Sequence, residues 1–253
     1  MDTAHGVAIE YERLTHVGRA YRRQRWFFVS MAAAIAVSVF IGFAPSYYLR
    51  GPSAARSLSL LVHVHGALFT AWILIFVVQA SLVAARQVSA HRRLGFAAAL
   101  LVVPMLVSGI SVAVAAARIE PLNAADTVVG MPRLVFLVIP FTSVVLFSLL
   151  AGLGLWYRRV ADVHKRFLLL ATIALLPPAL GRIPALAARG PAAFFGVTIL
   201  FIVALVGHDY WTRGRTHPVS LWAGLVLVVS FPGRVALGYT DAWQAFAQWL
   251  TVP

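Results

Sequence analysis

Three histidines, His91, His164 and His217, stand at the start of long apolar runs. Arg-Arg directly follows the first and Lys-Arg the second, and these two copies lie 73 positions apart. In both copies a proline follows the histidine by 13 positions, and the third histidine has a proline directly after it. This recurrence predicts repeated hairpins, in which each return helix begins with a histidine near basic residues.

Neutral imidazole is the commonest nitrogen ligand for zinc, copper and iron, and histidines from several helices can converge in a bundle. We therefore expect a metal or haem site formed by His91, His164 and His208. Asp209 is expected either to join these ligands or, like Asp162, to orient an imidazole. Two alternative interpretations are open: the basic histidine motifs anchor the chain to lipid phosphates, and the third histidine only starts a helix.

A second group, His65, Arg182 and Arg234, is expected near the opposite membrane face. Two guanidinium groups and an imidazole suit a carboxylate, haem propionates, a quinone carbonyl or a lipid phosphate. His63 cannot join His65 on one ion, because residues two apart point to different sides of a helix. The alternative is that both arginines extend toward the lipid headgroups and bind no ligand.

The composition places these residues in a membrane protein. Of 253 residues, 61% are hydrophobic and only 11% are charged, against about 25% charged in a soluble domain. The net charge of +13 does not indicate nucleic-acid binding, because the basic residues are confined to short segments between apolar runs. The absence of cysteine excludes disulfides and thiolate metal sites. No recognised catalytic motif occurs, so no catalytic residue is predicted.

Seven apolar runs are long enough to cross a bilayer as helices, since about 20 residues span its hydrocarbon core. They cover residues 26–48, 57–85, 94–117, 132–157, 167–187, 191–211 and 219–237. The chain therefore divides into a basic N-terminal segment (1–25), a transmembrane domain (26–238) and a short amphipathic C-terminal tail (239–253). Pro177 and Pro178 are expected to kink the fifth helix, because proline donates no backbone hydrogen bond.

The charges between the runs predict the orientation. Arginine and lysine crowd the segments after the second, fourth and sixth runs, while the other connections are sparser in charge and mixed in sign. The positive-inside rule then places the N-terminus inside and the C-terminus outside. The first 25 residues show no cleavable signal peptide, so the first run is expected to remain as an anchor. The expected fold is an all-α, seven-transmembrane helix bundle built from repeated hairpins.

Three segments carry a resemblance to a known family. The His-Arg-x-Leu-Gly loop at 91–95, the His-Lys-Arg sequence at 164–166 and the His-Asp-x-Trp-x-Arg-Gly-Arg-x-His-Pro segment at 208–218 resemble a bacterial family of uncharacterised multi-pass membrane proteins. The resemblance covers most of the chain from His63 onward and implies a bacterial inner (cytoplasmic) membrane. It implies no activity.

Two other resemblances are looser. Cytochrome b561-type proteins place paired histidines around two haems, and His65, His91, His164 and His208 would serve here. Because three of these four are expected at the inner face, at most one bis-histidine haem b fits. The seven-helix topology is also similar to the membrane hydrolases related to alkaline ceramidase and the progestin/adiponectin receptors, but their final-helix His-x-x-x-His motif is absent.

The preferred hypothesis is a protein that binds haem or a transition-metal ion (iron, copper or zinc) through the inner histidines. It would work in membrane electron transfer or in maturation of a respiratory complex, with a quinone or that complex as partner within the lipid bilayer. The first alternative is a non-enzymatic transporter or an accessory subunit of a membrane complex. The second is a zinc-dependent membrane hydrolase, so whether the chain is an enzyme stays open.

Overall fold

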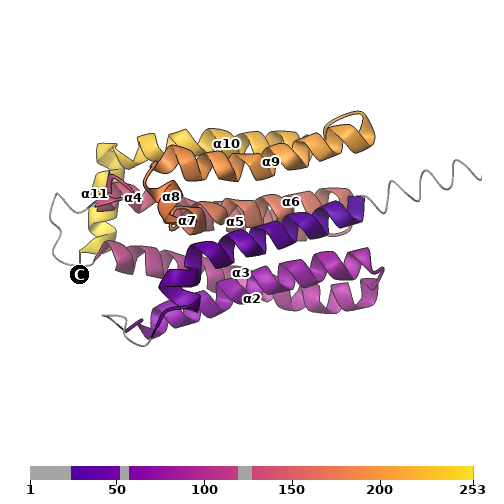
Figure 1. Ribbon diagram of the computed structural model, residues 1–253, viewed down its shortest axis with the longest axis horizontal. Coiled ribbons are helices and arrows are strands. Elements are labelled where there is room, and N and C mark those ends of the chain that lie inside the picture. The colour runs from indigo at the N-terminus through magenta and orange to yellow at the C-terminus, as the bar shows by residue number, and fades with distance from the viewer. Residues whose placement is uncertain (1–23, 52–56, 119–126, 253) are drawn as a thin grey trace, which may run out of the picture.

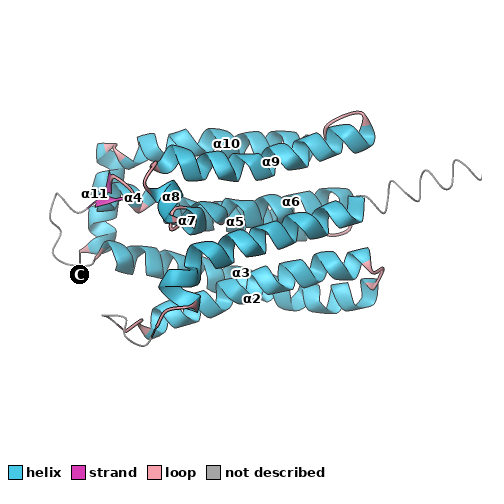
Figure 2. Cartoon of the chain, in the orientation of Figure 1, coloured by secondary structure: helices cyan, strands magenta, loops and turns pink. Residues whose placement is uncertain are grey.

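The computed structural model describes residues 24–51, 57–118 and 127–252. Seven helices in these ranges are long and apolar enough to cross a membrane, which confirms the predicted all-α fold with seven spans (Figures 1 and 2). The predicted basic segment 1–25 lies, apart from its last two residues, outside the described residues.

The first span, Gln24–Tyr48, ends in the π-helix η1 (Ala44–Tyr48), and the second and third are α2 (Leu60–Ala84) and α3 (Val88–Ala117). The fourth span combines α4 (Arg133–Phe136) with α5 (Val138–Trp156), and the fifth combines α6 (Ala161–Ala174) with α7 (Leu176–Leu180). The last two are α9 (Pro191–Arg213) and α10 (Pro218–Gly238). Shorter elements are β1 (Thr127–Val128), β2 (Met131–Pro132), α8 (Pro184–Ala187) and α11 (Asp241–Thr251).

Two helices begin six residues earlier than the sequence predicts, and the fifth span ends at Leu180 rather than at residue 187. The third helix begins at Val88 rather than at residue 94, so His91 lies within the first turn of α3. The fifth begins at Ala161 rather than at residue 167, so His164 lies within the first turn of α6. A hydropathy run stops at the first charged residues, whereas a helix continues through them because its backbone hydrogen bonds do not depend on side-chain polarity.

The two ends of the bundle differ in charge. Figure 1 shows the start of the first helix and the starts of α3, α6 and α10 at one end, which we call the basic end. Its arginine and lysine residues are Arg25, Arg86, Arg92, Arg93, Arg158, Arg159, Lys165, Arg166, Arg213 and Arg215. The opposite end, called the far end, carries α4, α8 and α11 together with the ends of η1 and α10. The sequence motifs that begin with a histidine therefore gather at one end.

The α6 helix is the most enclosed span. Six consecutive residues, 169–174, are fully buried, so every side of the helix contacts protein. After Ala174 the helix is interrupted at Leu175, and the short α7 that follows contains Pro177 and Pro178. The predicted kink is thus a break, because neither proline supplies the N–H group that would continue the α6 hydrogen-bond ladder.

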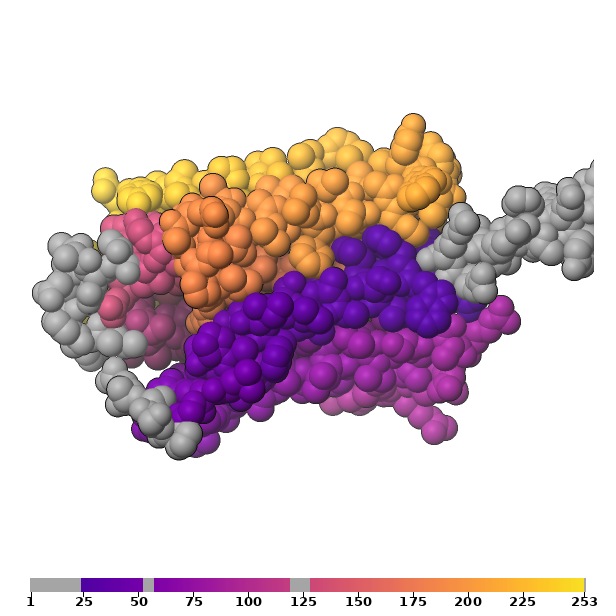
Figure 3. All heavy atoms as spheres, in the orientation of Figure 1, coloured from indigo at the N-terminus to yellow at the C-terminus, as the bar shows by residue number. Residues whose placement is uncertain are grey.

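The first helix packs against two parts of the bundle. Figure 3 shows it lying between α2 on one side and the segment that contains α7 to α9 on the other. A Cβ atom added at Gly42 would lie 2.2 Å from the Ala179 backbone oxygen of α7, and one added at Gly66 of α2 would lie 2.4 Å from the Tyr47 ring. The Gly42 contact requires glycine, because a side chain would meet backbone atoms that cannot rotate away, whereas a side chain at Gly66 would displace the Tyr47 ring.

Candidate functional site

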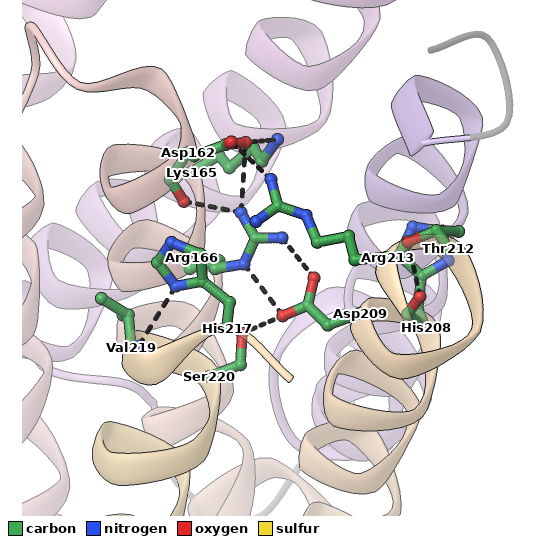
Figure 4. Close-up of polar contacts among 10 residues, drawn as sticks. All are labelled: Asp162, Lys165, Arg166, His208, Asp209, Thr212, Arg213, His217, Val219 and Ser220. Atoms are coloured by element: carbon green, nitrogen blue, oxygen red, sulfur yellow. Dashed lines mark hydrogen bonds and ion pairs between the residues drawn. The ribbon is translucent and has the colours of Figure 1, made fainter. Parts of the chain in front are cut away.

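The centre of the basic end is a buried ion pair between Arg166 on α6 and Asp209 on α9 (Figure 4). Neither side chain has exposed surface. The Arg166 Nε–H donates to Asp209 Oδ2 at 2.9 Å, and Nη2 donates to Oδ1. Ser220 of α10 donates its hydroxyl to Oδ2 at 2.5 Å. One carboxylate thus connects three helices.

A tight turn between α9 and α10 positions these groups. The α9 helix ends because Gly214 adopts a left-handed conformation, with φ of 68°, in which a side chain would be strained. Pro218 at the first position of α10 then restarts a helix, and His217 caps it by accepting a hydrogen bond from the Val219 backbone N–H at 3.1 Å. The turn brings Ser220 opposite Asp209.

A second carboxylate, Asp162, holds the cations at the mouth of this site. It lies in the first turn of α6, where the helix dipole favours a negative charge. Lys165 Nζ donates to Asp162 Oδ1 at 2.5 Å, Arg213 donates to Oδ2, and Arg166 Nη1 donates to the Asp162 backbone oxygen at 2.7 Å. Three cations therefore meet two carboxylates, and the cluster keeps a net positive charge.

The His217 imidazole borders this cluster and is held neutral. Burial lowers its pKa below the ordinary value of 6.5, and the Arg166 and Arg213 guanidinium groups lower this pKa further. Asp209 and Asp162 raise the pKa by less. The hydrogen bond from Val219 requires the same neutral state, because a protonated Nδ1 cannot accept.

These facts predict a pH dependence of stability. A histidine whose pKa is lowered in the folded state binds fewer protons there than in the unfolded state. The stability that it contributes is therefore full above pH 6.5, its ordinary pKa, and is lost as the pH falls below that value. We expect His217→Asn, which keeps a capping group worth about 1 kcal/mol, to reduce this loss. Melting temperatures of both proteins in detergent, measured on either side of this pH, test it. Equal losses in the two proteins would contradict the assignment.

His91 of α3 and His164 of α6 are brought together at the basic end. Their ring centroids lie 6.3 Å apart with an interplanar angle of 85°. His164 Nδ1 lies 2.7 Å from the Gly154 backbone oxygen, and because a carbonyl only accepts, this nitrogen carries the hydrogen. His91 Nδ1 is buried without a hydrogen-bond partner, and so is Gln79 Oε1 on α2.

The other two predicted ligands lie in a different environment. His208 stacks on Phe27 of the first helix, with ring centroids 3.8 Å apart and an interplanar angle of 2°. Both oxygens of Asp209 accept hydrogen bonds from Arg166. Among residues 24–51, 57–118 and 127–252, no group of three or more histidine and acidic side chains is arranged to hold a metal ion.

The predicted second group divides into two places. His65 packs against Phe69, with ring centroids 4.1 Å apart, and the Arg182 guanidinium lies near enough to act electrostatically on its ring. Arg182 also lies 4.5 Å above the Phe43 ring and donates to the Pro178 backbone oxygen at 2.6 Å. Although its side chain keeps exposed surface, the surrounding protein lowers the pKa of Arg182. Arg234 instead contacts α5.

Sequence reasoning missed that Arg166, Arg213 and Ser220 belong to one network with the two aspartates. A signal was present, because Asp162 and Arg166 are four residues apart and so face the same side of a helix. Ser220 carried no such signal, since a serine at the start of a helix is common.

Comparison of the chain with protein-family models, with curated proteins and with solved structures finds no match.

Proposed function

We propose that this chain is a multi-pass protein of the bacterial cytoplasmic membrane that binds a haem iron or a transition-metal ion at its basic end. His91 and His164 are the proposed ligands. Electron transfer, or maturation of a respiratory complex, is the proposed role. The observation that carries the proposal is the approach of these two imidazoles from α3 and α6 beside buried polar atoms that have no partner.

The separation of the two rings fits a shared ion. Two imidazoles that bind one ion from opposite sides have ring centroids roughly 6 Å apart, because each side contributes a metal–nitrogen bond of about 2.0–2.1 Å and roughly 1.2 Å from the ring nitrogen to the ring centre. The observed separation is 6.3 Å. Haem or copper bound here would supply one-electron chemistry.

The hydrogen bonding of His164 also suits a ligand. Donation of its Nδ1–H to the Gly154 carbonyl fixes the ring and leaves the lone pair on Nε2. Histidines that bind metals usually donate their other ring N–H group in this way. His91 Nδ1 and Gln79 Oε1 are buried without a hydrogen-bond partner, and such atoms usually mark a site completed by a ligand or water.

The charged network gives this end rigidity and a net positive charge. Arg166, Asp209 and Ser220 join α6, α9 and α10, so α6 is fixed at the turn that carries His164. The basic end is proposed to face the cytoplasm, since arginine and lysine concentrate there. This orientation places the N-terminus inside and the C-terminus outside, in agreement with the proposed repeated hairpins.

The far-end pair His65 and Arg182 is proposed as the contact for a partner within the bilayer. An imidazole and a guanidinium group within electrostatic reach of each other can bind a quinone carbonyl or an anionic group. Phe43 and Phe69 supply flat apolar surface beside these two polar groups.

The test is the absorption spectrum of protein purified in mild detergent, oxidised and then reduced with dithionite, with metal analysis of the same sample. Cells are supplied with iron and a haem precursor. We expect a Soret band and sharp reduced bands for haem, or stoichiometric iron or copper, and at least a tenfold loss of pigment or metal in His91→Ala and in His164→Ala. Stoichiometric zinc in a colourless sample would instead favour the hydrolase alternative.

The matched control is His63→Ala, because His63 is exposed near the far-end start of α2. This variant should retain the full pigment or metal content. A colourless and metal-free wild-type protein would contradict the proposal, and so would unchanged content in both of the first two variants.

A second candidate is a transporter, and it is favoured by the broken fifth span. Transporters often build substrate sites from interrupted helices, and the break at Leu175 lies in the most enclosed span. Uptake or efflux by proteoliposomes that contain metal-free protein would support this candidate.

A further inference from the structure

Arg234 is a buried cation near the far end. It lies on α10 four residues before Gly238, so it is about one helical turn from the end of the span. Its residue surface is 2% exposed. An arginine at this depth on a lipid-facing helix normally extends outward to the headgroups. Arg234 points inward instead, toward α5.

The contacts of Arg234 are neutral. Nη1 donates to Ser143 Oγ on α5 at 3.1 Å, and Nη2 donates to Ser230 Oγ on α10 at 3.1 Å. The guanidinium carbon lies 5.0 Å from the Phe231 ring centroid, and Phe231 stacks on Phe195 of α9 at 4.6 Å. The Nε atom is buried and has no hydrogen-bond partner.

No carboxylate among the described residues neutralises this cation. The three acidic residues of that part of the chain are Asp162, Asp209 and Asp241, and the first two are engaged at the basic end. Removing a charge from water costs several kcal/mol unless an opposite charge or several hydrogen bonds compensate for it. Two serine oxygens and one aromatic face leave Arg234 with a positive charge and an unused donor.

The two serines differ in what they can offer. The Ser230 hydroxyl hydrogen is already donated to the Leu227 backbone oxygen at 2.6 Å. The Ser143 hydroxyl accepts from Arg234, and the described residues provide no acceptor for its own hydrogen. Arg234 Nε–H and Ser143 Oγ–H are thus two buried donors on neighbouring helices.

The geometry points to an anion site in which Arg234 and Ser143 bind a phosphate or carboxylate group of a membrane amphiphile. Arg234 supplies the charge, Ser143 supplies a second donor, and Phe231 lies on the apolar side of the guanidinium group. The phosphate of a phospholipid and the carboxylate of a fatty acid share this chemistry. The site does not rest on the His91–His164 centre, so each can fail separately.

The test compares two serine variants in protein stripped of lipid with an uncharged maltoside detergent. Melting temperatures are measured with added phosphatidylglycerol, oleate or inorganic phosphate. The blanks are the same detergent without added lipid, and chloride at equal ionic strength. A ligand that binds the folded state raises the melting temperature. We expect one of these three anions to raise the melting temperature of the wild type and of Ser230→Ala equally. Ser143→Ala should need about a tenfold higher concentration of that anion for the same rise, as expected for one lost hydrogen bond to a charged group.

The rival explanation is that Arg234 only links α10 to α5. Only Ser143 lies on the other helix, so that role predicts a lower melting temperature for Ser143→Ala than for Ser230→Ala without any anion, and no difference between the two variants in the response to added anion. Equal anion responses in these two variants would overturn the site, and so would a wild type that responds to none of the three anions. Arg234→Lys, which keeps the charge and loses the planar fork, should bind the anion more weakly than wild type. Phosphorus and fatty-acid analysis of the protein before stripping identifies which source fills the site.

Discussion

Asp209→Leu should destabilise the protein by about 3–5 kcal/mol, which is the usual cost of removing one partner of a buried ion pair. The Arg166 guanidinium has no exposed surface, so without the Asp209 carboxylate its charge would remain buried. Asp162 offers only partial compensation, because its carboxylate already binds Lys165 and Arg213. The measurement is the free energy of unfolding in mixed micelles titrated with a denaturing detergent.

The double variant Arg166→Met with Asp209→Leu separates the charge effect from the packing effect. Replacing both members of a buried pair with apolar residues of similar size is often neutral or stabilising. We therefore expect the double variant to be at least as stable as either single variant, with a coupling energy of about 2 kcal/mol or more. Arg215→Met is the control, because Arg215 is an exposed loop residue at the same end. If Asp209→Leu cost no more than this control, the ion pair would not be a main source of stability.

The sequence was sufficient to predict the spans because each must be apolar over its whole length. It also located the histidines correctly at the starts of helices, since the repeated motif is local. His91 and His164 approach each other across α3 and α6, and that approach depends on which helices are neighbours. A hydropathy pattern contains no information about neighbours, so the expected convergence of His208 with them could not be evaluated from sequence.

The buried charges illustrate the same limit. The sequence pattern places Arg166 in a basic loop, because it follows His164 and Lys165 and a positive-inside pattern explains such residues without further contacts. Its burial follows from the helix beginning five residues earlier, at Ala161, and from the turn at Gly214 that places Asp209 and Ser220 beside it. The segments Gly-Arg-Ile at 181–183 and Gly-Arg-Val at 233–235 are similar, yet Arg182 contacts Phe43 and Arg234 contacts Ser143. Similar local sequences therefore did not imply one shared site.

Gly42→Val should destabilise the packing of the first helix more than any other single glycine replacement within a span. The closest approach is to the backbone oxygen and carbon of Ala179, at 2.2 and 2.7 Å from an added Cβ atom, and backbone atoms cannot rotate away as a side chain can. Gly42→Ala is expected to cost about 1–3 kcal/mol, as overpacking in a protein core does, and valine more. Thermal unfolding in detergent provides the measurement.

Gly196→Ala and Gly207→Ala are the matched controls, since a Cβ atom at either position would meet no atom within 4 Å. Alanine is the better helix former by about 1 kcal/mol, so these variants should be neutral or slightly stabilised. The first helix also carries Phe27, which stacks on His208, and Phe28, whose ring centroid lies 5.3 Å from Lys165 Nζ. Displacing it at Gly42 should therefore weaken the basic end as well, and any bound pigment or metal should dissociate at a lower temperature in Gly42→Val than in the controls. Equal melting temperatures for Gly42→Val and Gly196→Ala would show that the first helix is not packed against α7 through Gly42.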